Sequence, residues 1–243
     1  MRKSMEWREL EFCVELNDNK KILAMVMRVE HANGFQEMSM AEWEELLELG
    51  ARRGAKDSVR TLLEMWRLRG GSELGLSAKE PGAATPLMCA ARCFSPEDSA
   101  AIVRMLLPVS SAGGQDAMGR DALMIAAVQG NTEAARLMLA AKSGWLKEDL
   151  QGSTLLHGAA FSGCLEMLNV VWEGADGPRM VGAKNKLGLT PEQIAKSQGR
   201  HEAEAELSAR RRVVAEAGEL VASCADGAQQ SKSAAPQPKT LRL

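Results

Sequence analysis

The pattern of apolar and polar residues repeats along the middle of the chain. Each copy gives a turn, a short apolar helix with paired alanines, a tight turn and a longer second helix. The second helices carry adjacent apolar pairs, which are Leu62/Leu63, Leu106/Leu107, Met138/Leu139 and Val171/Trp172. In one register, the copies align on Leu47, Leu87, Leu123, Leu156 and Glu192. Successive copies are therefore 33 to 40 residues apart. A repeat of this length predicts helix pairs that stack side by side and share one continuous core.

Polar residues and glycines mark where the predicted helices begin and end. The later copies open with turns, at Asp116, Asp149 and Asn185. Thr-Pro pairs supply an N-cap and a first helical residue, at Thr85-Pro86 and Thr190-Pro191. Capping boxes are predicted at Ser39–Glu42 and Thr190–Gln193. Left-handed glycines are predicted to end the first helices, at Gly54, Gly130, Gly163 and Gly199.

The copies differ in their connecting segments. In the second copy, extra residues fall between the two helices, where Ser95 is predicted to cap the second helix and Pro96 to start it. Long exits follow the first copy at 66–80 and the fourth copy at 178–184. We expect these exits to become β-turn fingers whose length varies while the helical stack is kept.

The two ends of the array are predicted to differ from its middle. Residues 7–16 and 20–29 are interpreted as two helices, so that 1–36 forms a degenerate hairpin or cap. The repeat domain covers 37–212, with repeats at about 39–79, 80–115, 116–148, 149–184 and 185–212. Glu192 and Lys196 replace the usual Leu and Ala, as suits a polar C-terminal cap. The last helix is expected to run toward Ala222, within an extension and tail at 213–243 that is disordered from Ala225.

Composition narrows the class of protein. The chain has 243 residues, 45% of them hydrophobic and only 4% aromatic, with no Tyr, which argues against an all-β fold. A net charge of −2 argues against a general nucleic-acid binder. We predict no membrane span and no signal peptide, because every apolar run is short. The five cysteines are interpreted as reduced thiols in a cytoplasmic compartment.

The repeated motifs resemble those of the ankyrin-repeat family. They include Thr85-Pro86-Leu87, the Leu-His-x-Ala-Ala run at 156–160 and Gly174-Ala175-Asp176, and the resemblance covers about residues 40–207. It implies an all-α solenoid of stacked helix-turn-helix repeats with β-turn fingers. It also implies protein binding on a concave face formed by finger tips and inner helix ends.

Carried onto matching positions, the resemblance gives a row of candidate contact residues. The row comprises Arg52, Arg53, Arg92, Met118, Arg120, Val128, Gln129, Gln151, Ser153, Phe161, Ser162, Lys186 and Leu189. Met118, Val128 and Phe161 are apolar where a monomer usually exposes polar residues, which indicates a partner. The alternative is that they pack beneath the long fingers. Phe161 and a flanking Arg are the predicted anchors.

Other chemistry-bearing residues have structural explanations. In the family, a His three residues after Thr fixes the turn, which accounts for Thr154 and His157. No ligand spacing indicates zinc, and we expect neither metal nor cofactor. Cys89 and Cys93 are four residues apart on a helix and leave open a thiol-dependent enzyme or enzyme subunit, provided that a thiol pKa is depressed.

Two features near the C-terminus suggest other partners. Arg200 and the Arg210–Arg212 run leave nucleic-acid association open, although nearby glutamates favour a cationic helix end. The ending Thr240-Leu241-Arg242-Leu243 fits strand addition to a PDZ-type groove.

The sequence therefore predicts a non-catalytic, monomeric, cytoplasmic module that binds an unknown partner protein as a scaffold, adaptor or regulatory subunit. An effector that acts on a host partner remains the further alternative.

Overall fold

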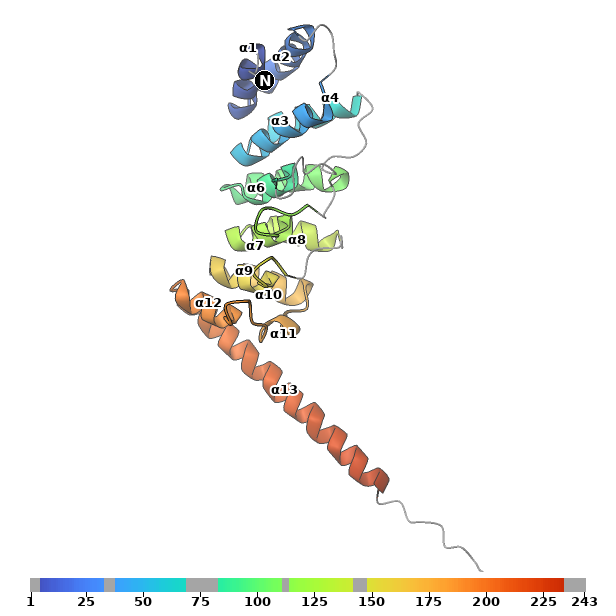
Figure 1. Ribbon diagram of the computed structural model, residues 1–243, viewed down its shortest axis with the longest axis vertical. Helices are drawn as coiled ribbons and strands as arrows, with labels where there is room; N and C mark the ends of the chain where they lie inside the picture. Colours follow the sequence, from blue (N-terminus) through green and yellow to red (C-terminus); the bar gives the residue numbers. More distant parts are fainter. Residues whose placement is uncertain (1–4, 33–37, 69–82, 111–113, 142–147, 234–243) are drawn as a thin grey trace, which may run out of the picture.

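The computed structural model describes residues 5–32, 38–68, 83–110, 114–141 and 148–233 as a stack of helix pairs (Figure 1). The pairs are α1 (Met5–Glu15) with α2 (Asn19–Ala32), α3 (Met40–Arg53) with α4 (Lys56–Leu68), α5 (Pro86–Ala91) with α6 (Pro96–Leu106), α7 (Ala122–Gln129) with α8 (Thr132–Ala140), α9 (Leu155–Ser162) with α10 (Leu165–Gly174), and α12 (Pro191–Ser197) with α13 (His201–Ser233). Two short helices, η1 (Leu107–Val109) and α11 (Gly177–Met180), follow α6 and α10. These ranges contain no β-strand, so the predicted all-α solenoid is confirmed.

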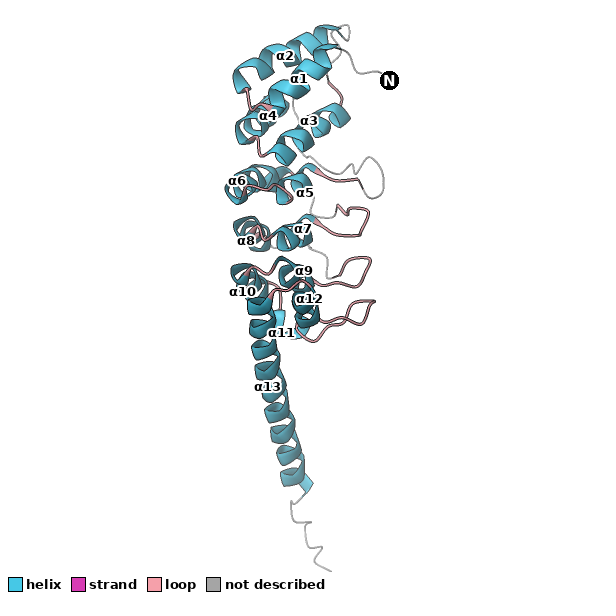
Figure 2. Cartoon of the chain, turned by 90° about the vertical axis from the view of Figure 1, so that its left-hand side faces the viewer, coloured by secondary structure: helices cyan, strands magenta, loops and turns pink. Residues whose placement is uncertain are grey.

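The helices form two layers. The inner layer consists of α1, α3, α5, α7, α9 and α12, each of which contacts the next, and the outer layer of α2, α4, α6, α8, α10 and α13 is built likewise. Loops project from the inner side of the stack (Figure 2). We call the described loops at 114–121, 148–154 and 184–190 the fingers. The surface between the fingers and the inner helices is the concave face.

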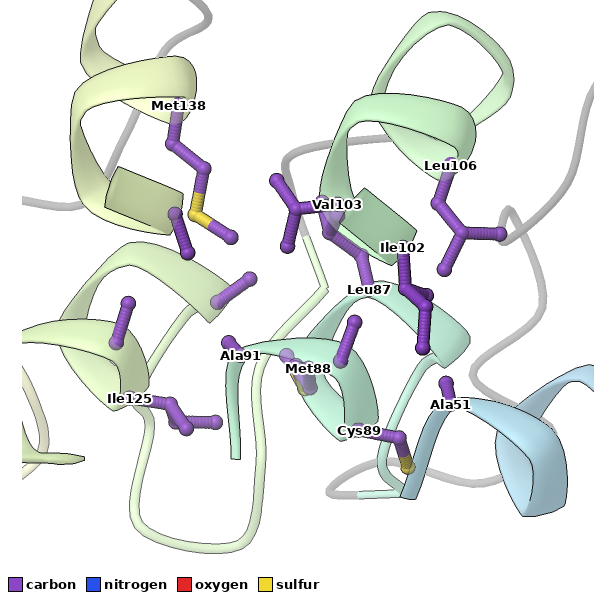
Figure 3. Close-up of a cluster of buried hydrophobic side chains, with 14 of the residues drawn as sticks. Ala51, Leu87, Met88, Cys89, Ala91, Ile102, Val103, Leu106, Ile125 and Met138 are labelled. Carbon is purple, nitrogen blue, oxygen red and sulfur yellow. The ribbon is translucent and has the colours of Figure 1, made fainter. Parts of the chain in front are cut away.

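The core lies between the two layers and continues from repeat to repeat. The paired alanines are buried in three successive inner helices, as Ala90/Ala91, Ala126/Ala127 and Ala159/Ala160. Their small side chains let neighbouring helices approach closely, while Ile102, Val103 and Met138 fill the space from the outer layer. Figure 3 shows Cys89 of α5 pointing toward α3, and Ile125 of α7 pointing toward α5. One inner helix thus packs into the next.

The predicted helix ends are confirmed. The hydroxyl of Thr85 accepts the Met88 N–H, and that of Ser95 accepts the Asp98 N–H. α3 begins with a full capping box at Ser39, and α12 begins with one at Thr190. The glycines predicted to end the inner helices all have positive φ, at Gly54, Gly130, Gly163 and Gly199. Local caps and left-handed glycines therefore fix these helix ends.

The fingers share one hydrogen-bonding scheme. In each finger, a side-chain oxygen near its start accepts the backbone N–H groups two and four residues later, from Asp116, Asp149 and Asn185. Neighbouring fingers are also joined, because the Leu150 N–H donates to the Met118 oxygen and the Lys186 N–H to the Gln151 oxygen. The finger tips are therefore held in register along the stack.

The structure corrects the sequence predictions at three places. The exit after α10 contains the short helix α11, because Asp176 adopts a left-handed conformation and Pro178 stands in the first turn that follows. α13 continues to Ser233, so the predicted disordered tail does not begin at Ala225. Alanine, glutamine and lysine in that segment favour a helix by their intrinsic propensity. The Arg210–Arg212 run consequently lies inside a helix, not at its end.

Of the other predictions, one is confirmed and two fall mostly or wholly outside the described residues. The N-terminal helical hairpin is present as α1 and α2, with Asn17 in a left-handed turn between them. Most of the exit at 66–80 lies outside the described residues, as do Thr240–Leu243 with their predicted PDZ-type ending.

Candidate protein-binding surface

The concave face carries a row of side chains from the ends of the inner helices. Arg52, Arg92, Val128 and Phe161 occupy equivalent positions near the ends of α3, α5, α7 and α9. Arg52 and Arg92 are exposed and Val128 is half-buried. Phe161 is 44% exposed and Met118 on the neighbouring finger is 50% exposed, so neither side chain is hidden beneath the fingers. The row runs from cationic to apolar, as predicted from the sequence.

The apolar end of this row borders a pocket of about 260 Å³. Five of the predicted contact residues line the pocket, namely Met118, Arg120, Val128, Ser153 and Phe161. The other lining residues are Met124, Asp149, Thr154, His157, Gly158 and Ile194, which the sequence did not assign to a site. The structure therefore brings two fingers and three inner helices together around one apolar depression.

His157 forms a rigid wall of this pocket. Its Nδ1 atom accepts the Thr154 N–H at 3.1 Å, which fixes the proton on Nε2, and Nε2 donates to the Leu189 oxygen at 3.0 Å. Burial lowers the pKa of His157 below its ordinary value of 6.5, although the bond to Leu189 partly opposes that shift. The predicted Thr154–His157 bond is thus confirmed, and the imidazole is neutral and fully engaged.

Arg120 is held at the pocket by a buried carboxylate. Its Nε and Nη2 atoms donate to Asp116 Oδ2 at 3.0 and 2.7 Å, and Arg92 reaches the same oxygen at 3.5 Å. Burial alone would raise the pKa of Asp116. The hydrogen bonds from Arg120 and from the finger N–H groups outweigh that effect, so the pKa is lowered. Both guanidinium groups are therefore ordered without a ligand.

The remaining predicted residues lie outside the pocket. Arg53 pairs with Glu15 at 2.9 Å, and Arg52 lies beside the Cys89 thiol. Ser162 is occupied as a cap, since its hydroxyl donates to the Ala159 oxygen at 2.8 Å. The exposed members of this group on the concave face are Gln129, Gln151 and Lys186, while Leu189 is half-buried. They extend the surface but do not build its apolar centre.

The thiols of Cys89 and Cys93 lie in the core of the stack. Cys89 and Cys93 are buried and free, with 3% and 4% of their surface exposed. Burial raises the pKa of Cys89, and the Glu48 carboxylate adds to the effect. A raised pKa disfavours the thiolate, which is the reverse of what nucleophilic chemistry needs. Within the described ranges, no group of three metal-ligating side chains converges.

The arginines near α13 mostly serve packing. Arg210 donates to the Leu168 oxygen and to Glu206 Oε1, and its guanidinium lies 4.9 Å from the Trp172 ring centroid. Arg211 binds Glu192 at 3.1 Å, and the Arg200 side chain lies over Gly163. The Arg210 and Arg211 contacts dock α13 onto the array and pair two of the charges predicted as an alternative nucleic-acid site.

A second group of exposed apolar side chains lies on α1, on α2 and in the turn between them, at the N-terminal end of the stack. It comprises Met5, Phe12, Leu16, Leu23 and Met27. None of these side chains lines the pocket on the concave face.

Comparison with known proteins identifies the family. The model for ankyrin repeats (3 copies) matches residues 47–143 and 87–181, which together span more than half of the chain. The chain belongs to the ankyrin-repeat family, whose members generally mediate protein–protein interactions. No curated protein matches the sequence. None of the helices in the described ranges has the length and hydropathy that a bilayer span requires.

Proposed function

We propose that the chain is a non-catalytic module that binds a partner protein on its concave face. The single observation that carries the proposal is the pocket of about 260 Å³ bordered by Met118, Val128 and Phe161. These apolar side chains are gathered at one place, and two of them are about half exposed. Clustered, partly exposed apolar groups flanked by Arg are typical of the energetic centre of protein interfaces.

The rigidity of this surface supports the same proposal. The contact groups are held in place before a partner arrives. Backbone hydrogen bonds join the fingers, His157 binds the Leu189 oxygen, and Arg120 is paired with Asp116. Little conformational freedom is then lost on binding, which favours affinity. We infer a scaffold, adaptor or regulatory role in which the partner brings the activity.

The test is recovery of a partner from a native cell extract by the tagged chain. The matched variant carries Phe161→Arg and Val128→Glu, with its fold checked by circular dichroism. A protein retained by the wild type and lost by the folded variant is the expected result. Equal recovery by both would place the binding site elsewhere and contradict the proposal.

We further propose that the chain acts as a monomer in the cytoplasm. Free thiols at Cys13, Cys89, Cys93 and Cys164 support a reducing compartment. Sedimentation velocity tests the oligomeric state. A single species at the monomer mass is expected, and a dimer that Phe12→Glu dissociates would instead assign self-association to the N-terminal apolar group.

A further inference from the structure

One position of the inner helices points toward the preceding repeat. It lies two residues after the aligned residue of each repeat, such as Leu87 or Leu123, and it holds Cys89 in α5 and Ile125 in α7. Both side chains are buried, and Figure 3 shows them directed at the neighbouring inner helix. The equivalent residues are Leu49 in α3 and Ile194 in α12. The side chain at this position therefore normally fills the space between two neighbouring inner helices.

In α9 the equivalent residue is Gly158, which has no side chain. A Cβ placed there would lie 3.2 Å from Val128 Cγ2 and 3.4 Å from Ala127 Cβ. Gly158 thus lets α9 lie close against α7, and its bare backbone is part of the pocket lining together with Val128 and Phe161. At this repeat, backbone rather than a side chain forms part of the pocket wall, at Gly158.

We propose that this pocket receives one large apolar side chain, of leucine, methionine or phenylalanine size, from a linear segment of the partner. The inference rests on the proposed function and names what its central pocket binds. A volume of about 260 Å³ is close to the lower limit of the roughly 300–1,000 Å³ of most small-molecule sites, and it has room for one large apolar side chain together with part of its neighbours in the segment.

The lining specifies an uncharged anchor. Met118, Met124, Val128, Phe161 and Ile194 supply the apolar walls. The two charged lining residues, Arg120 and Asp149, have opposite signs, and Arg120 is already paired with Asp116. The pocket therefore does not select a charge, and binding depends little on salt. Two methionines in the wall adapt to anchors of different shape.

The experiment starts with the full chain and a phage library of random linear peptides, with selection against the Phe161→Arg, Val128→Glu double variant. We expect enriched peptides to share one large apolar position. The affinity of a selected peptide is then measured for Gly158→Ala and Gly158→Ile, which add progressively more bulk. A graded loss is expected, reaching about tenfold or more for isoleucine. Phe94→Ser is the matched control, because Phe94 is an aromatic side chain 94% exposed outside the pocket.

A second variant covers the case in which added bulk disturbs folding. Val128→Ala adds no atoms and enlarges the pocket. Selection on this variant should shift the shared position toward larger side chains such as tryptophan. Peptide affinity for the wild type should change less than about threefold between low and high salt.

The outcomes separate the two proposals. If peptides lose affinity for the double variant but bind Gly158→Ile unchanged, and Val128→Ala keeps the same size preference, the pocket inference is wrong and the proposed concave-face function stands. If no sequence is enriched over the double variant, the pocket inference is wrong, and the partner-recovery experiment decides the proposed function separately. A steep loss of affinity with salt would also overturn the uncharged anchor.

Discussion

The Nε2 atom of His157 in α9 lies 3.0 Å from the backbone oxygen of Leu189, in the finger of the next repeat. One buried imidazole therefore joins a helix start to a neighbouring finger. The bond to Thr154 requires the neutral ring, because Nδ1 accepts the Thr154 N–H only when it carries no proton.

This arrangement makes stability depend on pH. The pKa of His157 is lowered from 6.5 in the folded chain, so the unfolded chain takes up the proton first. The stabilising contribution is complete above pH 6.5 and is lost as the pH falls below that value toward the folded pKa. Urea unfolding midpoints at about pH 7.5, 6.5 and 5.5 should show this decline.

The matched control is His157→Gln. Gln193 makes the same capping box in α12, so glutamine keeps the helix start and removes the titrating ring. The pH dependence between 6.5 and 5.5 should flatten in this variant. An unchanged slope would show that another group is responsible.

Leu156 and Phe161 should separate stability from binding. Leu156 is fully buried, so Leu156→Ala creates a core cavity that costs about 2–5 kcal/mol. Phe161 is 44% exposed, so Phe161→Ala should cost only about 1 kcal/mol of folding free energy. It should nevertheless weaken partner binding by about 2 kcal/mol. Denaturant titration decides the point: equal losses in stability would make Phe161 a core residue.

Asn131 should be the residue whose loss most clearly uncouples two repeats. Its Nδ2 atom donates to the Ala91 and Cys93 oxygens, at 2.8 and 2.9 Å, in the preceding repeat. Asn131→Ala leaves both carbonyls without this donor in a buried place and should cost about 1–3 kcal/mol in a thermal or denaturant melt. Gln129→Ala removes an exposed amide of the same repeat and should change stability by less than about 0.5 kcal/mol. Similar effects for both would contradict this role.

Cys89 should react slowly. Burial raises its pKa, so the thiolate is scarce at neutral pH. Iodoacetamide labelling, followed at this residue by mass spectrometry, should be slower than that of free cysteine under the same conditions. A faster rate would contradict this prediction and support the alternative of a thiol-dependent enzyme.

Local signals predicted the fold well. The Thr–Pro caps and the left-handed glycines act over a few residues, so the sequence placed the helix ends correctly. The sequence did not predict that α13 continues beyond Ala225, because a segment with few large apolar residues is typical of disorder. Intrinsic helix propensity needs no core partner.

The candidate site was predicted only in part. Phe161, Val128 and Met118 were found because the repeat register places them along one face. Gly158 was missed, although its register position holds a larger side chain in the other repeats. The bonds of Asn131 to the preceding repeat and of His157 to Leu189 were missed as well, because they join residues more than 30 positions apart.

The most direct test of the concave-face proposal is site-specific photo-crosslinking. A benzoylphenylalanine is placed at position 118 or 161 on the concave face, and at the exposed position 173 on α10 as the control. After illumination in a native cell extract, the account predicts a covalent adduct with one partner protein at 118 and 161 and none at 173. An adduct at 173 without adducts on the concave face would contradict it.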